Sequence, residues 1–338
     1  MQFQGDLKED ISQPHIAIMK ARIEDAVVYS PYPKVDIPIC SVYSAISKFL
    51  SMRPEKLAVV DEQISLTRGE FLVRMKRYAA GFQAHGLGPE HRVAVHLGNS
   101  AENLTALFAL TFTGASVILC NPVLNQDELL FQMSDGGASH AFTSSQLAPK
   151  VLAVSSKLQL KKNHGSALLL VWYDWPRKRH EISHYSFVAN LHMTGSVLTY
   201  EEKENDVLLA WYPLTYASGF LFTIVARASA PPASRDDTGE CADPPSLLLV
   251  RYGADGHGPP SVRKLNVGGT VLTCSLADRL RAAFPGLRCL RNLYGMSESC
   301  SVLCSPPTDE ISAANIGFPA PMVELKVRNL IWNARWFQ

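Results

Sequence analysis

Short apolar strands alternate with amphipathic helices along the first part of the chain, and this order constrains the fold more than any other feature. Strands are expected at residues 57–60, 92–97, 115–120 and 140–143, and helices at 41–52, 67–86, 101–113 and 125–134. A Thr67–Glu70 capping box opens the second helix and Gly86 ends it. Apolar strands separated by helices are typical of a parallel sheet covered by helices. The predicted fold class is therefore α/β, with helix-covered, mostly parallel sheets.

The same order resumes later in the chain. A helix is expected at residues 183–195, a strand at 264–267, a helix from a Ser275 cap to Phe284, and a strand at 288–293. The intervening stretch 228–262 contains three Pro-Pro pairs and several Gly. This composition predicts a loop or a poorly ordered insert.

Charge and cysteine content exclude several classes of function. The net charge is +1 with no strongly basic or acidic half, so nothing predicts nucleic-acid binding. The seven Cys are an odd number without a C-x-x-C pair, which favours reduced thiols in an intracellular compartment. The polar, acidic Met1–Asp10 stretch does not look like a signal peptide.

One uncharged segment, Val207–Ala226, is almost long enough to span a bilayer. It contains Tyr, Thr, Ser, Pro and Gly and has no adjacent basic flank. We therefore predict that this segment forms a buried strand, turn and helix. The competing hypothesis is a membrane-associated protein that uses this segment.

The candidate site follows the strand at 288–293, which is predicted to run directly into a loop, Tyr294-Gly295-Met296-Ser297-Glu298-Ser299. Open α/β sheets bind ligands beyond the carboxyl ends of their strands. A Tyr ring can stack on a base, a Ser hydroxyl can donate to a phosphate, and a Glu carboxylate can hold Mg²⁺. Taken alone, the six residues fit a plain polar turn about as well.

The wider pattern resembles one family, the AMP-forming ligases that include acyl-CoA synthetases, 4-coumarate–CoA ligases and beetle luciferases. The resemblance covers about residues 20–227 and 262–327. Its motifs are the stretch from Ala21 to Pro38, Gly86-Leu87-Gly88 before Arg92-Val93-Ala94-Val95, Tyr294-Gly295-Met296-Ser297-Glu298, Asn315-Ile316-Gly317-Phe318-Pro319 and Val323-Glu324-Leu325-Lys326-Val327.

The resemblance implies a nucleotide site for ATP or AMP with Mg²⁺. Tyr294 would stack on adenine, Ser297 would contact the α-phosphate where the family usually has Thr, and Glu298 would bind Mg²⁺. The remaining nucleotide-binding residues would be Gly268, Gly269, Thr270, Asn292, Leu293, Gly295 and Met296.

The resemblance also implies a pocket for a small carboxylic acid, fatty or aryl. It would be lined by Tyr216, Ala217, Ser218, Gly219 and Gly269. Tyr216 stands where the family has a His that positions the carboxylate, and a core aromatic is an equal reading of it. The family forms an acyl-AMP and then transfers the acyl group to CoA, through charge stabilisation and positioning.

The glycine-rich loop that should hold the phosphates is absent. The residues at its expected place, Leu169–Pro176, contain two Trp and no Gly. Trp has the single codon TGG, which read one nucleotide later always gives Gly, so the shifted frame permits Ser-Ser-Gly-Thr-Thr-Gly. We therefore expect paired small insertions or deletions around residues 168–180, with 228–262 as another candidate. A genuinely divergent sequence is the alternative.

The predicted division is an N-terminal extension at 1–40 that packs on the domain, an adenylation domain at 41–327 with a small β-rich subdomain, and an aberrant tail at 328–338. The family's smaller C-terminal domain, with its catalytic Lys, has no counterpart before Gln338. Negligible synthetase activity is therefore expected. A non-catalytic nucleotide- or acyl-binding remnant, or a pseudogene product, is the alternative.

The sequence does not specify the carboxylic acid substrate or the oligomeric state. It also does not distinguish the cytoplasm from the peroxisome as the compartment. The resemblance implies a C-terminal peroxisomal tripeptide in many relatives, and the aberrant tail of this chain cannot show whether one is expected here.

Overall fold

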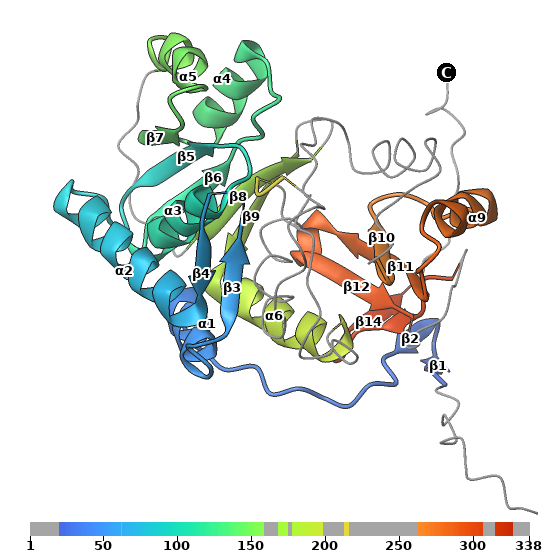
Figure 1. The fold of residues 1–338 in the computed structure, drawn as a ribbon. Coiled ribbons are helices and arrows are strands. Elements are labelled where there is room, and N and C mark those ends of the chain that lie inside the picture. The colour runs from blue at the N-terminus through green and yellow to red at the C-terminus, as the bar shows by residue number, and fades with distance from the viewer. Residues whose placement is uncertain are drawn as a thin grey trace, which may run out of the picture.

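The computed structural model describes residues 20–61, 63–158, 168–174, 178–198, 213–215, 262–306 and 315–326 (Figure 1). Its helices are α1 (Val42–Ser51), α2 (Arg68–Ala84), α3 (Ala101–Phe112), α4 (Gln126–Asp135), α5 (Ala148–Ser155), α6 (His184–Leu198), α9 (Cys274–Ala283) and the 3₁₀ turn η3 (Ser297–Ser299). Its strands are β1 (Arg22–Glu24), β2 (Val27–Tyr29), β3 (Leu57–Val60), β4 (Ser65–Thr67), β5 (Arg92–His96), β6 (Ser116–Leu119), β7 (His140–Thr143), β8 (Leu168–Asp174), β9 (Lys178–Ser183), β10 (Lys264–Gly268), β11 (Cys289–Met296), β12 (Ser301–Ser305), β13 (Phe318–Pro319) and β14 (Glu324–Lys326).

The first large sheet has the order β7-β5-β6-β8-β9 and is parallel except for the edge strand β9. Alternate residues of β5 point to opposite faces: Val93 and Val95 pack with α3, whereas Ala94 packs with α4 and α5. Helices therefore cover both faces, and the α/β class predicted from the apolar alternation is confirmed.

Local capping explains where the helices of this layer begin and end. Thr67 and Glu70 form the predicted capping box at the start of α2, and Asn125 and Glu128 form a second one at α4. Gly114 follows the last turn of α3 with φ of +84°, a conformation that glycine adopts without steric cost.

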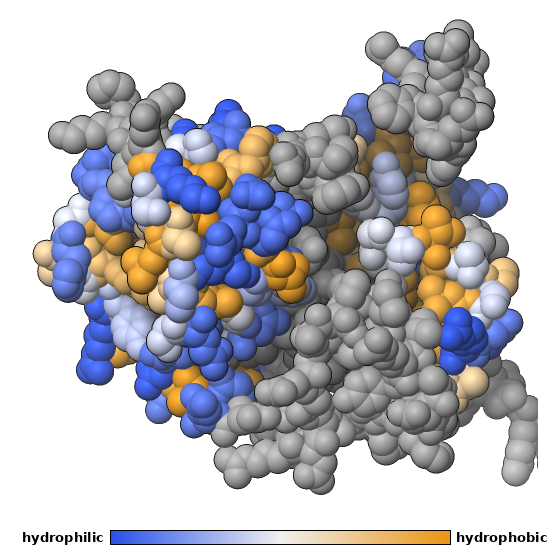
Figure 2. Space-filling model, turned by 90° about the horizontal axis from the view of Figure 1, so that it is seen from above, coloured by the Kyte–Doolittle hydropathy of each residue, from blue (hydrophilic) through white to orange (hydrophobic). Residues whose placement is uncertain are grey.

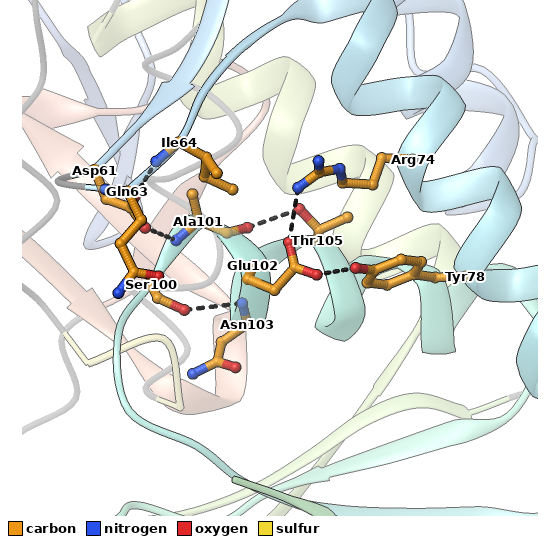
Figure 3. Close-up of polar contacts among 10 residues, drawn as sticks. All are labelled: Asp61, Gln63, Ile64, Arg74, Tyr78, Ser100, Ala101, Glu102, Asn103 and Thr105. Carbon is orange, nitrogen blue, oxygen red and sulfur yellow. Dashed lines mark hydrogen bonds and ion pairs between the residues drawn. The ribbon is translucent and has the colours of Figure 1, made fainter.

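Polar contacts tie α2, α3 and the β3–β4 turn together (Figure 3). The Asp61 carboxylate accepts the backbone N–H groups of Gln63, Ile64 and Ala101 at 2.8–2.9 Å. Burial alone would raise the pKa of Asp61, but these amides hold that pKa below its ordinary value. Glu102 pairs with Arg74 at 2.9 Å and accepts the Tyr78 hydroxyl.

The second large sheet has the order β10-β11-β12-β13, and α9 packs on β10 and β11. β10 and β11 are parallel, whereas β11, β12 and β13 run antiparallel. The cap of α9 is Thr273, whose hydroxyl accepts from Leu276 N. The expectation that Ser275 caps this helix was wrong, because Ser275 already lies in the first helical turn.

Helix α6 joins the two sheets. It contacts α1 on one side and β12 on the other (Figure 1). Phe187 and Val188 are fully buried in the same core as α1 and α3, and His184 Nδ1 accepts the first amide of α1, Val42 N, at 3.2 Å. A third, small sheet, β1-β2-β14, attaches residues 22–29 to the last described strand.

Strands β8 and β9 lie at the place in the sequence where the phosphate loop is expected. The β8 backbone pairs in parallel with β6, and β9 returns antiparallel to β8. Arg179, in β9, donates to the Asp135 carbonyl at 2.7 Å at the end of α4. Residues 175–177, between the two strands, lie outside the described residues.

None of the helices in the described part of the chain combines the length and the hydropathy that a membrane span requires. Hydrophilic and hydrophobic residues are interspersed over the described surface seen from above (Figure 2). Of the uncharged segment 207–226, only residues 213–215 are described, and Leu214 and Thr215 are each 4% exposed.

Candidate functional site

The carboxyl end of β10 lies beside Leu293, the last residue of β11 that pairs with β10. The parallel register pairs Gly268 with Leu293, so the segment Gly268–Thr270 leaves its strand next to the point where Tyr294 begins. These two predicted parts of the nucleotide site are 26 positions apart in sequence and are brought together by the pairing. Ligands bind at this edge of open parallel sheets.

The Gly268–Thr270 segment offers an open backbone surface. Gly269 has φ of +74°, and a Cβ built on it would meet no atom within 4 Å. Gly268 lies against the neighbouring strand, where a Cβ would come to 3.4 Å from the Leu293 carbonyl oxygen. A flat ligand can therefore approach the backbone at Gly269 closely.

The predicted loop beginning at Tyr294 is a strand at first. β11 continues to Met296 and pairs with β12, with a bulge between Tyr294 and Gly295. Tyr294 and Met296 are each 42% exposed. The expectation that the strand ends at Leu293 was wrong, because its continuation depends on pairing with β12 rather than on local apolar pattern. The bulge re-aims the side chains that follow it.

A short turn, η3, then presents Ser297 and Glu298. The Ser299 hydroxyl donates to the Met296 carbonyl at 2.8 Å, and Cys300 N donates to the Ser297 carbonyl at 3.0 Å. Glu298 is exposed and its side chain makes no hydrogen bond or ion pair within the described residues. An unengaged carboxylate at a turn fits a hard cation such as Mg²⁺.

That carboxylate could supply only part of a metal's ligands. Among the described residues, no group of three or more His, Cys, Asp or Glu side chains is placed to hold a metal ion. Mg²⁺ usually keeps several waters and shares phosphate oxygens with the substrate, so a single carboxylate at this turn still fits a nucleotide-bound Mg²⁺.

Two of the predicted nucleotide residues lie beneath the exposed face. Asn292 and Leu293 are 5% and 6% exposed, and Leu293 packs on Val302 of β12. They shape the strand end rather than its open surface. The predicted acid-pocket residues Tyr216, Ala217, Ser218 and Gly219 lie outside the described residues.

The sequence reasoning missed two asparagines. Asn99 Oδ1 accepts Leu214 N at 2.9 Å and anchors the segment just before Tyr216. Asn190, on α6, donates to the Ser299 carbonyl at 3.3 Å. Both contacts join residues more than 100 positions apart, and a local pattern in the sequence carries no signal of such pairing.

The sequence matches the family described as AMP-binding enzyme over residues 47–179 and 234–330, which is more than half of the chain. The chain belongs to this family. The family assignment made from the Tyr294–Glu298 motif and its companions is therefore confirmed, and the match includes the anomalous hairpin up to residue 179.

Its relatives in sequence include CoA ligases. A 2-succinylbenzoate–CoA ligase from Bacillus subtilis is 31% identical over 99 residues, which cover 29% of this chain and 20% of that protein. A long-chain-fatty-acid–CoA ligase from the same organism is 24% identical over 185 residues, 51% of this chain and 32% of that protein. The matches thus span at most about a third of the length of these relatives.

Solved structures agree on the fold. A long-chain-fatty-acid-CoA ligase from Archaeoglobus fulgidus superposes with a TM-score of 0.72 at 16% identity, covering 89% of this chain and 72% of that one. The anthranilate CoA ligase AuaEII, solved in complex with anthranoyl-AMP, gives 0.68 at 15% identity, covering 85% and 64%. The predicted architecture, the large domain of adenylate-forming ligases, is confirmed.

Proposed function

We propose that this chain is the nucleotide-binding domain of an acid–thiol ligase, which joins a fatty or aryl carboxylic acid to CoA through an acyl-AMP. The observation that carries the proposal is the β10–β11 register, which pairs Gly268 with Leu293 and so brings the open backbone at Gly269 near the residue that follows, the exposed Tyr294. CoA-ligase relatives support the reaction class.

In this proposal the residues of the site have separate roles in binding the nucleotide, the metal and the acid. Tyr294 stacks on the adenine ring, and the backbone at Gly269 borders the same ring. Ser297 donates its hydroxyl to the α-phosphate, and Glu298 holds a Mg²⁺ that neutralises phosphate charge when bound. Tyr216 to Gly219 line the acid pocket. These residues position the nucleotide and stabilise charge where it develops, which is the main contribution of protein groups to such transfers.

A second candidate is a domain that binds AMP without turning it over. It is favoured by the hairpin of β8 and β9, whose extended backbone at Leu168–Asp174 occupies the place of a glycine-rich phosphate cradle. Removing one preorganised donor to a developing charge typically costs a factor of ~10²–10³ in rate. We therefore expect negligible acid-dependent pyrophosphate exchange by the chain as written.

Binding of AMP, measured by titration calorimetry, tests the nucleotide site. Base–aromatic stacking is worth about 1–3 kcal/mol, so the Tyr294→Ala variant is expected to bind AMP roughly 5- to 150-fold more weakly. Tyr185→Ala is the matched control, since this tyrosine of α6 is also exposed, at 52%. Equal affinities of the wild type and Tyr294→Ala would overturn the adenine assignment.

Sequencing of the transcript and the genomic DNA across the codons of Gly165 to His184 separates the two candidates. A restored Ser-Ser-Gly-Thr-Thr-Gly reading would make the chain's gene product an ordinary ligase domain. Confirmation of Trp172 and Trp175 leaves the binding domain as the function, and pyrophosphate exchange at ordinary rates by that chain would contradict it.

A further inference from the structure

Helix α6 holds the inner side of the turn that presents Ser297 and Glu298. Asn190 is 1% exposed, and its side-chain amide donates to the Ser299 carbonyl at 3.3 Å. Helix α6 and β12 are in contact along this region (Figure 1). A buried helix residue thus makes a side-chain hydrogen bond directly to the backbone of the turn.

The turn depends on its surroundings to keep its shape. Cys300, which closes it, has φ of +68°, a left-handed conformation that is unfavourable for a cysteine. Its side chain is 2% exposed and belongs to the same buried cluster as Phe187 and Val188 of α6. The packing of Cys300 and the Asn190 hydrogen bond therefore hold the turn together on the α6 side.

The outer side of the turn is left open. In the described part of the chain, the Ser297 hydroxyl and the Glu298 carboxylate have no hydrogen-bond partner. Tyr294 lies on the other side of the bulge, in the strand that β10 supports. The half of the site that faces phosphate and metal is thus held by α6, whereas the half that faces adenine is held by the sheet.

We propose that Asn190 is a positioning residue for the phosphate and metal half of the site. By donating to Ser299, it fixes η3 so that Ser297 and Glu298 point together at a phosphate and its Mg²⁺. The inference rests on the proposed nucleotide-binding function, but the hydrogen bond that carries it can be tested without any nucleotide.

The test uses the full chain with Asn190→Leu, which keeps a similar volume and removes the donor. A net hydrogen bond of ordinary strength corresponds to a change of about 3- to 10-fold. Amide exchange of the Met296–Cys300 backbone is expected to speed up by about that factor. Affinity for Mg·AMP is expected to fall by the same factor, while affinity for adenosine, which lacks phosphate, stays unchanged.

Two further variants separate positioning from general stability. His192→Leu changes an exposed residue of the same helix and is expected to alter neither reading. Asn190→Gln keeps an amide donor and is expected to restore much of the wild-type exchange rate and Mg·AMP affinity. Its recovery would also show that Asn190→Leu acts through the lost donor and not through misfolding.

The outcomes distinguish the positioning role of Asn190 from the proposed nucleotide-binding function on which it rests. Unchanged exchange in Asn190→Leu, or an equal loss of affinity for adenosine and Mg·AMP, would overturn the positioning role. A different result is faster exchange in Asn190→Leu together with a wild type that binds neither adenosine nor Mg·AMP. Asn190 would then hold the turn, but the proposed nucleotide site would be overturned, and with it the role of Asn190 in that site.

Discussion

Replacing Gly317 by alanine is expected to destabilise the fold by about 3 kcal/mol. Gly317 has φ of +73° and directly precedes β13, where Phe318 pairs with Ser305. A Cβ on Gly317 would overlap the Ser305 carbonyl oxygen and Pro306 N. The left-handed conformation costs about 1 kcal/mol. Relief of the overlap would loosen the two paired positions of β12 and β13, where hydrogen bonds of about 1 kcal/mol each would add a loss of about 2 kcal/mol.

Gly269 provides the matched control. Its φ of +74° is almost the same, but a Cβ there would meet nothing within 4 Å. Gly269→Ala should therefore lose only the conformational part, about 1 kcal/mol. The difference of about 2 kcal/mol between the two variants isolates the crowding of Gly317 by the β12 strand end.

Urea and thermal unfolding measure both losses. At about 2–4 °C per kcal/mol for a large domain, Gly317→Ala should lower Tm by roughly 6–12 °C and Gly269→Ala by roughly 2–4 °C. Equal losses in the two variants would refute the reasoning, since they would mean that the close approach of Gly317 to Ser305 contributes nothing.

Three further predictions concern stability. Gly81→Ala, at an exposed position inside α2 where a Cβ meets nothing within 4 Å, should stabilise the chain by about 0.5–1 kcal/mol in urea unfolding; a loss would contradict it. Thr67→Ala removes the side-chain cap of α2 and should cost about 1 kcal/mol, seen as a lower urea midpoint at unchanged slope. Burial lowers the pKa of His96 below its ordinary value of 6.5, so its stability contribution is complete above pH 6.5 and is lost as the pH falls below that value toward the folded-state pKa. His96→Gln keeps a side-chain amide donor that can face the Cys120 carbonyl but has no group that titrates in this range. Its urea midpoint should therefore fall less than that of the wild type between pH 7.5 and about pH 5. An equal fall in the variant and the wild type would contradict the inference that His96 is buried as a neutral imidazole.

Local signals made many elements in the first half of the chain predictable. β3 and β7 have the predicted bounds, and the capping box at Thr67 and the positive-φ Gly86 stand where the pattern placed them. These features depend on neighbours within a few residues, whose preferences act before any tertiary contact forms.

Non-local pairing made the rest unpredictable. The extension of β11 to Met296 requires β12, and the sheet β1-β2-β14 joins residues about 300 positions apart. Thr273 and Ser275 are both good N-cap residues, and the local sequence did not show that Thr273 is the cap of α9. In the candidate site, the nucleotide residues could be named from their motif, but Asn190 and Asn99 could not.

The division of the chain at residues 40 and 327, the reading-frame origin of residues 168–180 and the roles of the named site residues stay predictions. The site roles depend on whether the backbone and side chains beyond the Gly268–Leu293 pair hold a nucleotide in the arrangement that the register allows.

A crystal structure of the full chain, grown with saturating AMP and Mg²⁺, would locate the nucleotide relative to β10 and β11. The adenine ring is expected to stack on Tyr294 beside the Gly269 backbone, with the phosphate at Ser297 and the metal at Glu298. AMP bound elsewhere on the chain, or a Tyr294 ring without adenine at saturating AMP, would contradict it.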